Sequence, residues 1–380
     1  ASATFDDENG RTSLRVEKAY LTTDFDDLNV LIGYNVVNWG SAVSSSPTNF
    51  MNPVDFSDRS TNPNLFGTPM INGNYHSDFG TFSAYLLPGF VQPEFGDAGS
   101  RFRPFWETSA DFARFEKSNE NDLDFALRYT NNFSVGSGNF DVAASYFKGT
   151  NRNPISLPGC IRPGGAITDA ICQNANDVVQ AAYESSAGFG VDPKAFWAFL
   201  EANLTDAGAT ALSTIPAVGF FPYYNEIERI GVDVNYSTDD LQLRFEGTYN
   251  KTSRNNYVEA VVGGDYTFNN VAGSDGTLTV AVEYLYSGLA KTNPFVVFGD
   301  DIFVGLDYRT NNDRDTRFNT GVFYDLNSDA VLATAKASTR LNDALSLEVS
   351  FQKAFVTGYN DPLAFTKRDG FVELKLRSFF

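Results

Sequence analysis

The stretch from Asp240 to Asn250 reads DLQLRFEGTYN and alternates between two kinds of residue. The apolar positions are Leu241, Leu243, Phe245 and Tyr249, and the positions between them carry Gln242, Arg244, Glu246 and Thr248. A period of two places alternate side chains on opposite faces of a β-strand. The stretch therefore predicts a strand with one apolar face and one polar, charged face.

The same period recurs along most of the chain. Many segments exceed the roughly 5–6 residues of an average soluble strand and reach the roughly 9–11 residues that a tilted membrane strand needs. Charges on the polar faces would each need a partner in a packed core, whereas a wet lumen tolerates them. The predicted strands lie near 13–25, 28–39, 79–88, 104–116, 122–133, 138–149, 225–238, 239–250, 255–268, 276–289, 300–310, 314–326, 329–341, 344–355 and 366–380.

The connections between these segments alternate between short and long. Residues 26–27 and 342–343 form tight turns, whereas 40–77 and 150–224 are long excursions. Short turns at one end and long loops at the other are typical of outer-membrane barrels, which have even strand numbers. We therefore expect an all-β protein: one domain over 1–380, a transmembrane antiparallel up-and-down β-barrel of about 16 strands, with Ala1 to Phe5 as the remaining upward strand. A barrel of that size leaves an aqueous channel.

The composition narrows the function classes. Lys+Arg 28 against Asp+Glu 47 give a net charge of −19, which argues against nucleic acid as a partner. One His disfavours most metal sites and acid/base chemistry. His76, Ser77 and Asp78 contain the residue types of a hydrolase, but three adjacent residues cannot converge into a triad. We expect neither an enzyme nor a cofactor.

The loop 150–224 is too long for a simple connection and contains both cysteines. A disulfide between Cys160 and Cys172 would close a short loop in an oxidising compartment. The sequence also predicts helices over 176–184 and 195–204. Two interpretations of this partly helical extracellular loop stay open, namely a constriction inside the pore and a cap at its mouth.

Two stretches resemble known outer-membrane proteins. Residues 370–380 resemble the terminal strand of Gram-negative outer-membrane proteins, which ends in an aromatic residue and which the barrel-assembly machinery reads. Residues 33–40, GYNVVNWG, followed by Asn52-Pro53-Val54-Asp55, resemble a Gly-x-x-Val-Val-Asn-Trp-Gly motif of an uncharacterised family of proteobacterial outer-membrane barrels. Here Tyr34 and Asn35 replace an Arg and a Gln. The resemblance implies a location in the Gram-negative outer membrane among lipid and lipopolysaccharide, and by analogy a homo-trimer.

Charged residues on the predicted polar faces are candidates for lining the pore. The set is Arg128, Asp233, Arg244, Glu246, Glu283, Asp307, Arg309, Arg340 and Glu348. The excess acidic residues fall mostly in loops, where they would attract cations to the mouth, bind structural Ca²⁺ or keep the surface soluble. Aromatic residues at strand ends, Trp39 and Phe147 among them, are expected at the lipid headgroups.

These observations predict a porin. Small polar or ionic solutes, cations preferentially, would diffuse through a lumen narrowed by the 150–224 loop, and rings of charge would set the selectivity. The alternative is a non-conducting barrel that acts as a scaffold or sheath for a partner protein in the outer membrane. A third interpretation, a soluble sandwich, requires the apolar faces to pack together.

Overall fold

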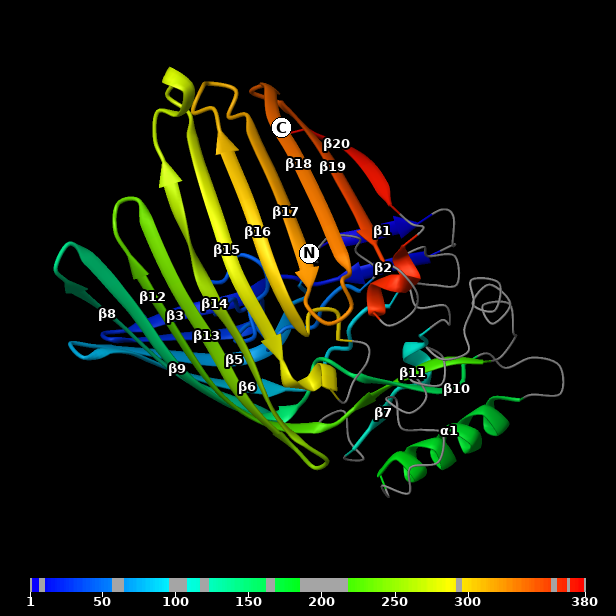
Figure 1. The fold of residues 1–380 in the computed structure, drawn as a ribbon. Helices are drawn as coiled ribbons and strands as arrows, with labels where there is room; N and C mark the ends of the chain where they lie inside the picture. The colour runs from blue at the N-terminus through cyan, green and yellow to red at the C-terminus, as the bar shows by residue number, and fades with distance from the viewer. Residues whose placement is uncertain are drawn as a thin grey trace.

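A single large antiparallel sheet dominates the molecule (Figure 1). The computed structural model describes residues 2–6, 11–56, 65–95, 108–116, 123–161, 168–184, 218–291, 296–356, 361–367 and 370–378. Fifteen strands pair in chain order: β3 (Ala19–Phe25), β4 (Leu28–Asn35), β5 (Thr68–Ser77), β6 (Gly80–Pro88), β8 (Leu123–Val135), β9 (Gly138–Thr150), β12 (Glu226–Ser237), β13 (Leu241–Thr252), β14 (Asn256–Phe268), β15 (Thr277–Ser287), β16 (Asp300–Arg309), β17 (Arg317–Asp325), β18 (Val331–Asn342), β19 (Leu345–Phe355) and β20 (Phe371–Ser378). The predicted all-β, antiparallel architecture is confirmed.

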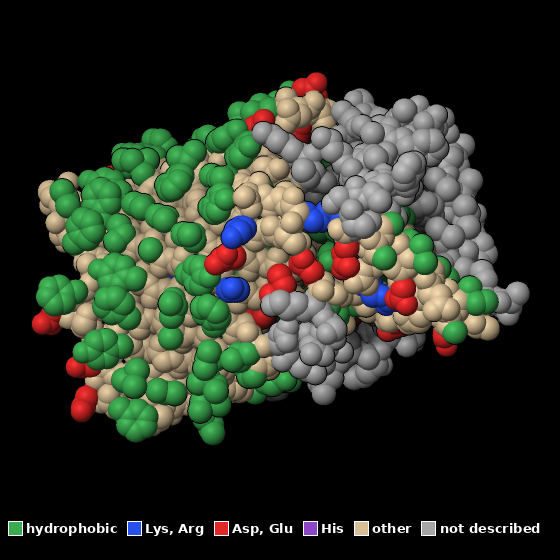
Figure 2. Space-filling view, turned by 90° about the horizontal axis from the view of Figure 1, so that it is seen from below, with side chains coloured by type: hydrophobic (Ala, Val, Ile, Leu, Met, Phe, Trp, Pro, Cys, Tyr) green, Lys and Arg blue, Asp and Glu red, His purple; other side chains and the backbone are tan. Residues whose placement is uncertain are grey.

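The two faces of the sheet differ as the alternation predicts. On β13, Leu243 and Phe245 are 47% and 42% exposed, whereas Arg244 and Glu246 between them are 5% and 0% exposed. Figure 2 shows apolar side chains spread over the outer face of the strands, with acidic side chains at the far rim. We call the face that carries Arg244 and Glu246 the inner wall.

Short turns lie at one end of the strands and long connections at the other (Figure 1). Two residues join β3 to β4, and two join β18 to β19. At the opposite end, β4 and β5 are separated by residues 36–67, and β9 and β12 by residues 151–225. The asymmetry expected from the sequence is therefore present, and we call these the short-turn end and the long-loop end.

Two strand predictions were wrong: one strand was missed and one predicted strand is absent from the described part of the large sheet, so the number of strands is unchanged. Strand β5 falls inside residues 40–77, which were expected to form one long loop. The predicted strand 104–116 is wrong in its described part, where Ala110–Phe112 form a 3₁₀ turn and only Arg114–Phe115 (β7) are extended. Its first residues, 104–107, lie outside the described residues.

The N-terminal prediction was also wrong. Ser2–Asp6 (β1) does not join the large sheet but pairs with Arg11–Arg15 (β2) in a two-stranded sheet. A hairpin needs only a short loop closure, so the local pairing competes with a long-range one. Among the strands that the structure describes, no ladder joins β3 to β20, so the sheet has two free edges. Both edge strands run toward the short-turn end.

A small lobe lies beyond the strand ends at the long-loop end (Figure 1). It contains β7, β10 (Ile155–Cys160), β11 (Val218–Tyr224) and helix α1 (Asp169–Glu184). The predicted disulfide between Cys160 and Cys172 is confirmed. The amide of Asn176 bonds both backbone groups of Cys160, which fixes α1 against β10. The predicted helix 176–184 is present and begins earlier, whereas 195–204 lies outside the described residues.

Candidate constriction of the lumen

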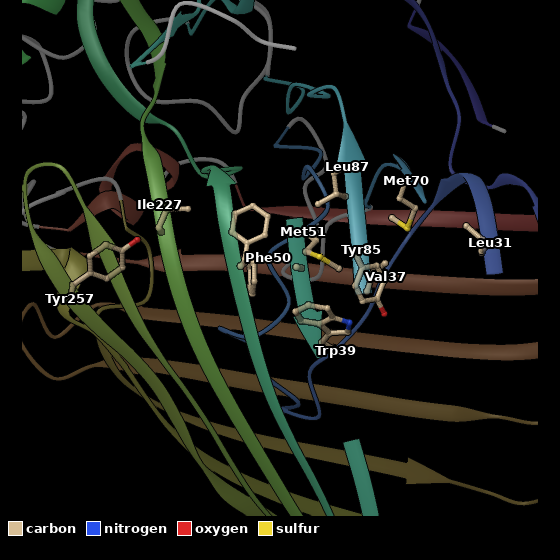
Figure 3. Packing of buried hydrophobic residues seen from close by; sticks show 12 residues of the cluster. Leu31, Val37, Trp39, Phe50, Met51, Met70, Tyr85, Leu87, Ile227 and Tyr257 are labelled. Atoms are coloured by element: carbon tan, nitrogen blue, oxygen red, sulfur yellow. The ribbon is translucent and has the colours of Figure 1, made fainter. Parts of the chain in front are cut away.

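Residues 36–56, between β4 and β5, lie against the inner wall, and we call them the inserted segment. Figure 3 shows Trp39, Phe50 and Met51 of this segment among side chains of the wall. The edge-on rings of Phe50 and Phe147 are 5.1 Å apart, and those of Trp39 and Tyr85 are 5.5 Å apart. Burying such side chains contributes roughly 1.5–3 kcal/mol each. The inserted segment is thus packed like part of a core.

Glu246 of β13 holds the middle of the inserted segment. Its Oε1 accepts hydrogen bonds from the backbone N–H groups of Ser41 and Ala42, both at 2.6 Å. Its Oε2 accepts bonds from the hydroxyls of Ser46 at 2.5 Å and Thr48 at 2.8 Å. A carboxylate that is 0% exposed needs such donors to offset the loss of water. Glu246 therefore serves as an anchor for the segment.

Glu283 of β15 is a second anchor beside the first. Its two oxygens accept bonds from the backbone N–H groups of Val43 at 2.9 Å and Ser44 at 2.8 Å. Arg244 donates to the same carboxylate at 3.2 Å and also bonds Asp265. Since Glu283 is 1% exposed, this ion pair is shielded from salt and water. The two glutamates together hold residues 41–44, 46 and 48 against one wall.

Two arginines hold the flanks of the inserted segment. Arg128 donates to the carbonyl oxygen of Trp39 at 3.2 Å, and its guanidinium lies 4.9 Å from the Trp39 ring centroid. Arg229 donates to the carbonyl oxygen of Pro47 at 3.1 Å and lies 4.4 Å from the ring centroid of Phe50. Contacts of a cation with an aromatic face are worth about 2 kcal/mol when desolvated. The wall and the segment are therefore joined by both polar and aromatic contacts.

Asn52 closes the end of the inserted segment. Its Oδ1 accepts a bond from the Val37 backbone N–H at 2.7 Å, and its Nδ2 donates to the carbonyl oxygens of Phe66 at 2.8 Å and Asn35 at 3.1 Å. One buried amide thus joins the end of β4 to the approach to β5. This contact gives a structural reason for the Asn in the Asn52-Pro53 stretch, while the family resemblance of that stretch stays a prediction.

The structure divides the nine predicted pore-lining residues into two groups. Five of them surround the inserted segment: Arg128, Asp233, Arg244, Glu246 and Glu283. The other four lie on β16, β18 and β19 toward the short-turn end: Asp307, Arg309, Arg340 and Glu348. All nine belong to the inner wall, and their role in lining a pore stays a prediction.

Sequence analysis placed two aromatic residues wrongly. Trp39 and Phe147 were expected at the lipid interface, but they are 8% and 1% exposed within the cluster that the inserted segment forms with the wall. Arg229 and the hydroxyl donors Ser44, Ser46 and Thr48 were missed. The polar run SAVSSSPT over 41–48 was the available signal, because hydroxyl groups and free backbone donors suit a buried carboxylate.

Acidic residues gather at the long-loop end of the wall. Asp301, Asp325 and Asp361 are each less than a tenth exposed, and Ser328 donates to Asp361 at 2.7 Å. Desolvation by burial raises the pKa of Asp361. No group of three or more His, Cys, Asp or Glu side chains in the described part of the chain is arranged to hold a metal ion. Calcium on acidic loops stays a prediction. None of the described helices has the length and hydropathy required to cross a membrane.

Comparisons with known proteins give matches of structure only. No protein-family model and no curated protein sequence matches the chain. A mutant of the Rh. blastica porin is 13% identical, with 95% of this chain and 88% of that chain covered and a TM-score of 0.39. Escherichia coli Wzi, described as an outer membrane protein involved in group 1 capsule assembly and a carbohydrate-binding β-barrel, is 8% identical, with 95% and 69% covered and a TM-score of 0.44. The Ralstonia pickettii toluene transporter TbuX is 10% identical, with 78% of each chain covered and a TM-score of 0.26.

Proposed function

We propose that this chain is a porin of the Gram-negative outer membrane, in which small polar or ionic solutes diffuse past a constriction formed by the inserted segment. The observation that carries the proposal is the contrast between the two faces of one large sheet. The outer face exposes apolar side chains over most of its strands. A soluble monomer rarely exposes a contiguous apolar patch larger than a few hundred Å². A lipid environment removes the free-energy cost of exposing these side chains to water, because lipid tails are as apolar as the side chains.

The proposed constriction differs from the one expected from the sequence. The described parts of the 150–224 loop form the small lobe beyond the strand ends (Figure 1), whereas residues 36–56 lie on the inner wall. Two buried glutamates and two arginines fix the inserted segment in one position. A rigid segment on the wall of the lumen would limit solute size, and the polar groups around it would set selectivity.

Closure of the barrel is a further part of the proposal. Both edge strands, β3 and β20, run toward the short-turn end, so one strand of opposite direction between them would complete an antiparallel barrel of sixteen strands. Residues 11–15 are suited to this place because only three residues separate them from β3. Closure would remove both free edges, which otherwise invite pairing with other chains.

Cross-linking tests the closure directly. With one cysteine at Leu14 and another at Leu374 or Leu376 of β20, oxidation of the membrane-inserted protein is expected to give a disulfide for one of the two pairs. The product is detected as a gel mobility change that reverses on reduction. A cysteine at Leu14 paired with Leu306 of the distant strand β16 is the control. Cross-linking of the control pair alone would contradict the closure.

Solute preference and partners follow from the proposed location. The net charge of −19 and the acidic residues at the long-loop end support a preference for cations, which a reversal potential measures. Lipid and lipopolysaccharide would contact the outer face, and assembly into a homo-trimer is part of the proposal by analogy alone.

A non-conducting barrel is the second candidate, and one observation favours it. Four buried apolar residues of the inserted segment pack with eight of the wall, and a second apolar cluster lies on β14–β19 near the same end. If these clusters seal the lumen, the chain would act as a scaffold or sheath for a partner protein.

Single-channel conductance in a planar bilayer distinguishes the two candidates. We expect the purified protein to insert from detergent and give stable, ohmic current steps, because a wall with charged residues remains beside the inserted segment. The reversal potential under a salt gradient then reports ion preference. Insertion that is verified by protease protection and gives no current would overturn the channel and favour the scaffold.

A further inference from the structure

Six cationic side chains gather on the inner wall over β16–β20, toward the short-turn end. They are Arg309, Arg317, Lys336, Arg340, Lys375 and Arg377. Strand pairing places them on one face: Arg309 lies opposite Arg317, Lys336 opposite Asn319, and Lys375 opposite Glu348. Asp307 and Glu348 of the predicted pore lining belong to the same face. We call this region the basic wall.

The basic wall is compact. Arg309, Arg317, Ser338, Glu348 and Lys375 are consecutive partners across five strands, so the row spans about 19 Å at about 4.8 Å per strand. Lys336 and Arg377 lie two residues away from this row along their strands, one on each side of it. This adds about 13 Å along the strand direction. A solute in this part of the lumen would meet several cations at once.

The carboxylates of this region do not neutralise the cations. Asp307 bonds Arg317 at 2.7 Å and Arg309 at 3.2 Å. Glu348 lies 2.9 Å from Lys336, 3.9 Å from Lys375 and 3.7 Å from Arg377. Glu373, 3.7 Å from Lys375, is the third carboxylate on the described strands of the basic wall. Among the described strand residues of the basic wall, three acids lie among six cations, an excess of three positive charges in a chain whose net charge is −19. Asp313, Asp315 and Asp343 lie in the adjoining turns and not on these strands.

The cations are accessible while the central acids are not. The side chains of Arg309, Arg317 and Arg377 are 50%, 42% and 54% exposed, compared with 20% for Asp307 and 13% for Glu348. Arg340 is exposed and makes no ion pair with any residue in the described ranges. A solute in the lumen would therefore contact mainly the cationic groups. Like charges this close repel one another unless an anion lies between them.

We propose that the basic wall binds small multivalent oxyanions, solutes that carry two or more phosphate or carboxylate groups. Guanidinium groups donate paired hydrogen bonds to such oxygens, and lysines add point charges. Low-dielectric walls strengthen the field inside a lumen. The passage of these anions rests on the proposed function, whereas their binding to the wall does not.

Pyrophosphate binding to the full chain in a nonionic detergent tests the site without a phospholipid present. We expect isothermal titration calorimetry at low ionic strength to show binding that weakens as salt is added. The variant Arg340→Gln/Arg377→Gln, which changes two exposed side chains on either side of β19, should bind about tenfold more weakly or worse. Citrate should give the same ranking, because carboxylates share this chemistry.

The matched control is Lys148→Gln/Lys251→Gln. Those two lysines lie on either side of β12 on the outer face, opposite Glu228, so the change in net charge is the same. The control should bind pyrophosphate as the unmodified chain does. Absence of binding to the unmodified chain, or an equal loss in both variants, would overturn the proposal.

A bilayer recording separates this proposal from the channel proposal. Pyrophosphate added to a conducting protein should reduce the current, and the reduction should be smaller in Arg340→Gln/Arg377→Gln. If the protein binds pyrophosphate in detergent but carries no current, the result supports anion binding at the basic wall and contradicts the channel. A conducting protein that shows no binding rejects the basic wall alone.

Discussion

Replacing Glu246 and Glu283 together with alanine is expected to release the inserted segment and to raise the single-channel conductance above that of the unmodified chain. The two carboxylates accept bonds from donors at Ser41, Ala42, Val43 and Ser44. A hydrogen bond to a charged group is worth about 1.5–3 kcal/mol, so the loss of a single one changes the ratio of docked to released segment by about 10–150-fold. The contacts that remain, those of Trp39 and Phe50 and the bond of Arg229 to Pro47, lie toward the two ends of residues 41–48 and do not replace the bonds to residues 41–44.

Two measurements report the release. Planar-bilayer recording gives the conductance, and limited proteolysis followed by mass spectrometry shows whether cleavage begins within residues 36–56. The control is Glu228→Ala on the outer face of β12, where the carboxylate is 38% exposed and pairs with Lys251. Glu246→Gln should have a smaller effect than Glu246→Ala, because the amide oxygen still accepts. Unchanged conductance and unchanged protection in the double variant would show that the glutamates do not hold the segment.

The expected increase does not depend on whether the unmodified protein conducts. In a porin, release of the segment widens an open path. In a barrel that the inserted segment seals, it creates current where none existed. The double variant therefore informs both candidate functions and locates the barrier in residues 36–56.

The large sheet could be predicted because its signal is local. On β13 the type of each residue indicates the face on which its side chain lies. The stretch DLQLRFEGTYN was therefore sufficient to assign one exposed apolar face and one polar face. Strand β5 was missed because Pro69, Gly73 and two asparagines weaken the same alternation, although Met70 is buried and Ile71 is 42% exposed. A polar inner face tolerates Asn as well as an aliphatic residue, so hydrophobic periodicity loses contrast there.

The inserted segment could not be predicted from periodicity. The sequence pattern is the same whether a polar residue on the inner face contacts water or protein. Glu246 contacts residues that lie 198–205 positions away in the sequence. Trp39 has the composition expected of an interface residue, yet Arg128 and Tyr85 enclose it. Local sequence thus gives the faces of the strands, whereas the occupant of the lumen depends on long-range contacts.

Breaking the ion pair between Asp124 and Arg152 is expected to destabilise the long-loop end of the large sheet. Both side chains are almost fully buried, at 3% and 2% exposed, and Arg152 also lies over the rings of Phe90 and Phe147. Removing one partner of a buried pair leaves an unpaired charge and costs about 3–5 kcal/mol. Arg152→Ala should therefore lower the free energy of unfolding by that amount, as measured by urea titration in detergent with tryptophan fluorescence.

The more exposed ion pair of Arg114 with Asp177 supplies the comparison. Asp177 is 64% exposed, so Asp177→Ala should cost about 0–1 kcal/mol. The double variant Asp124→Leu/Arg152→Met removes both buried charges and should unfold less readily than Arg152→Ala, because no charge is left unpaired. If Arg152→Ala instead matched Asp177→Ala, water would have to reach Asp124 once the guanidinium is gone. The long-loop end of the sheet would then be more open to water at β8 and β9 than the packing around Phe90 indicates.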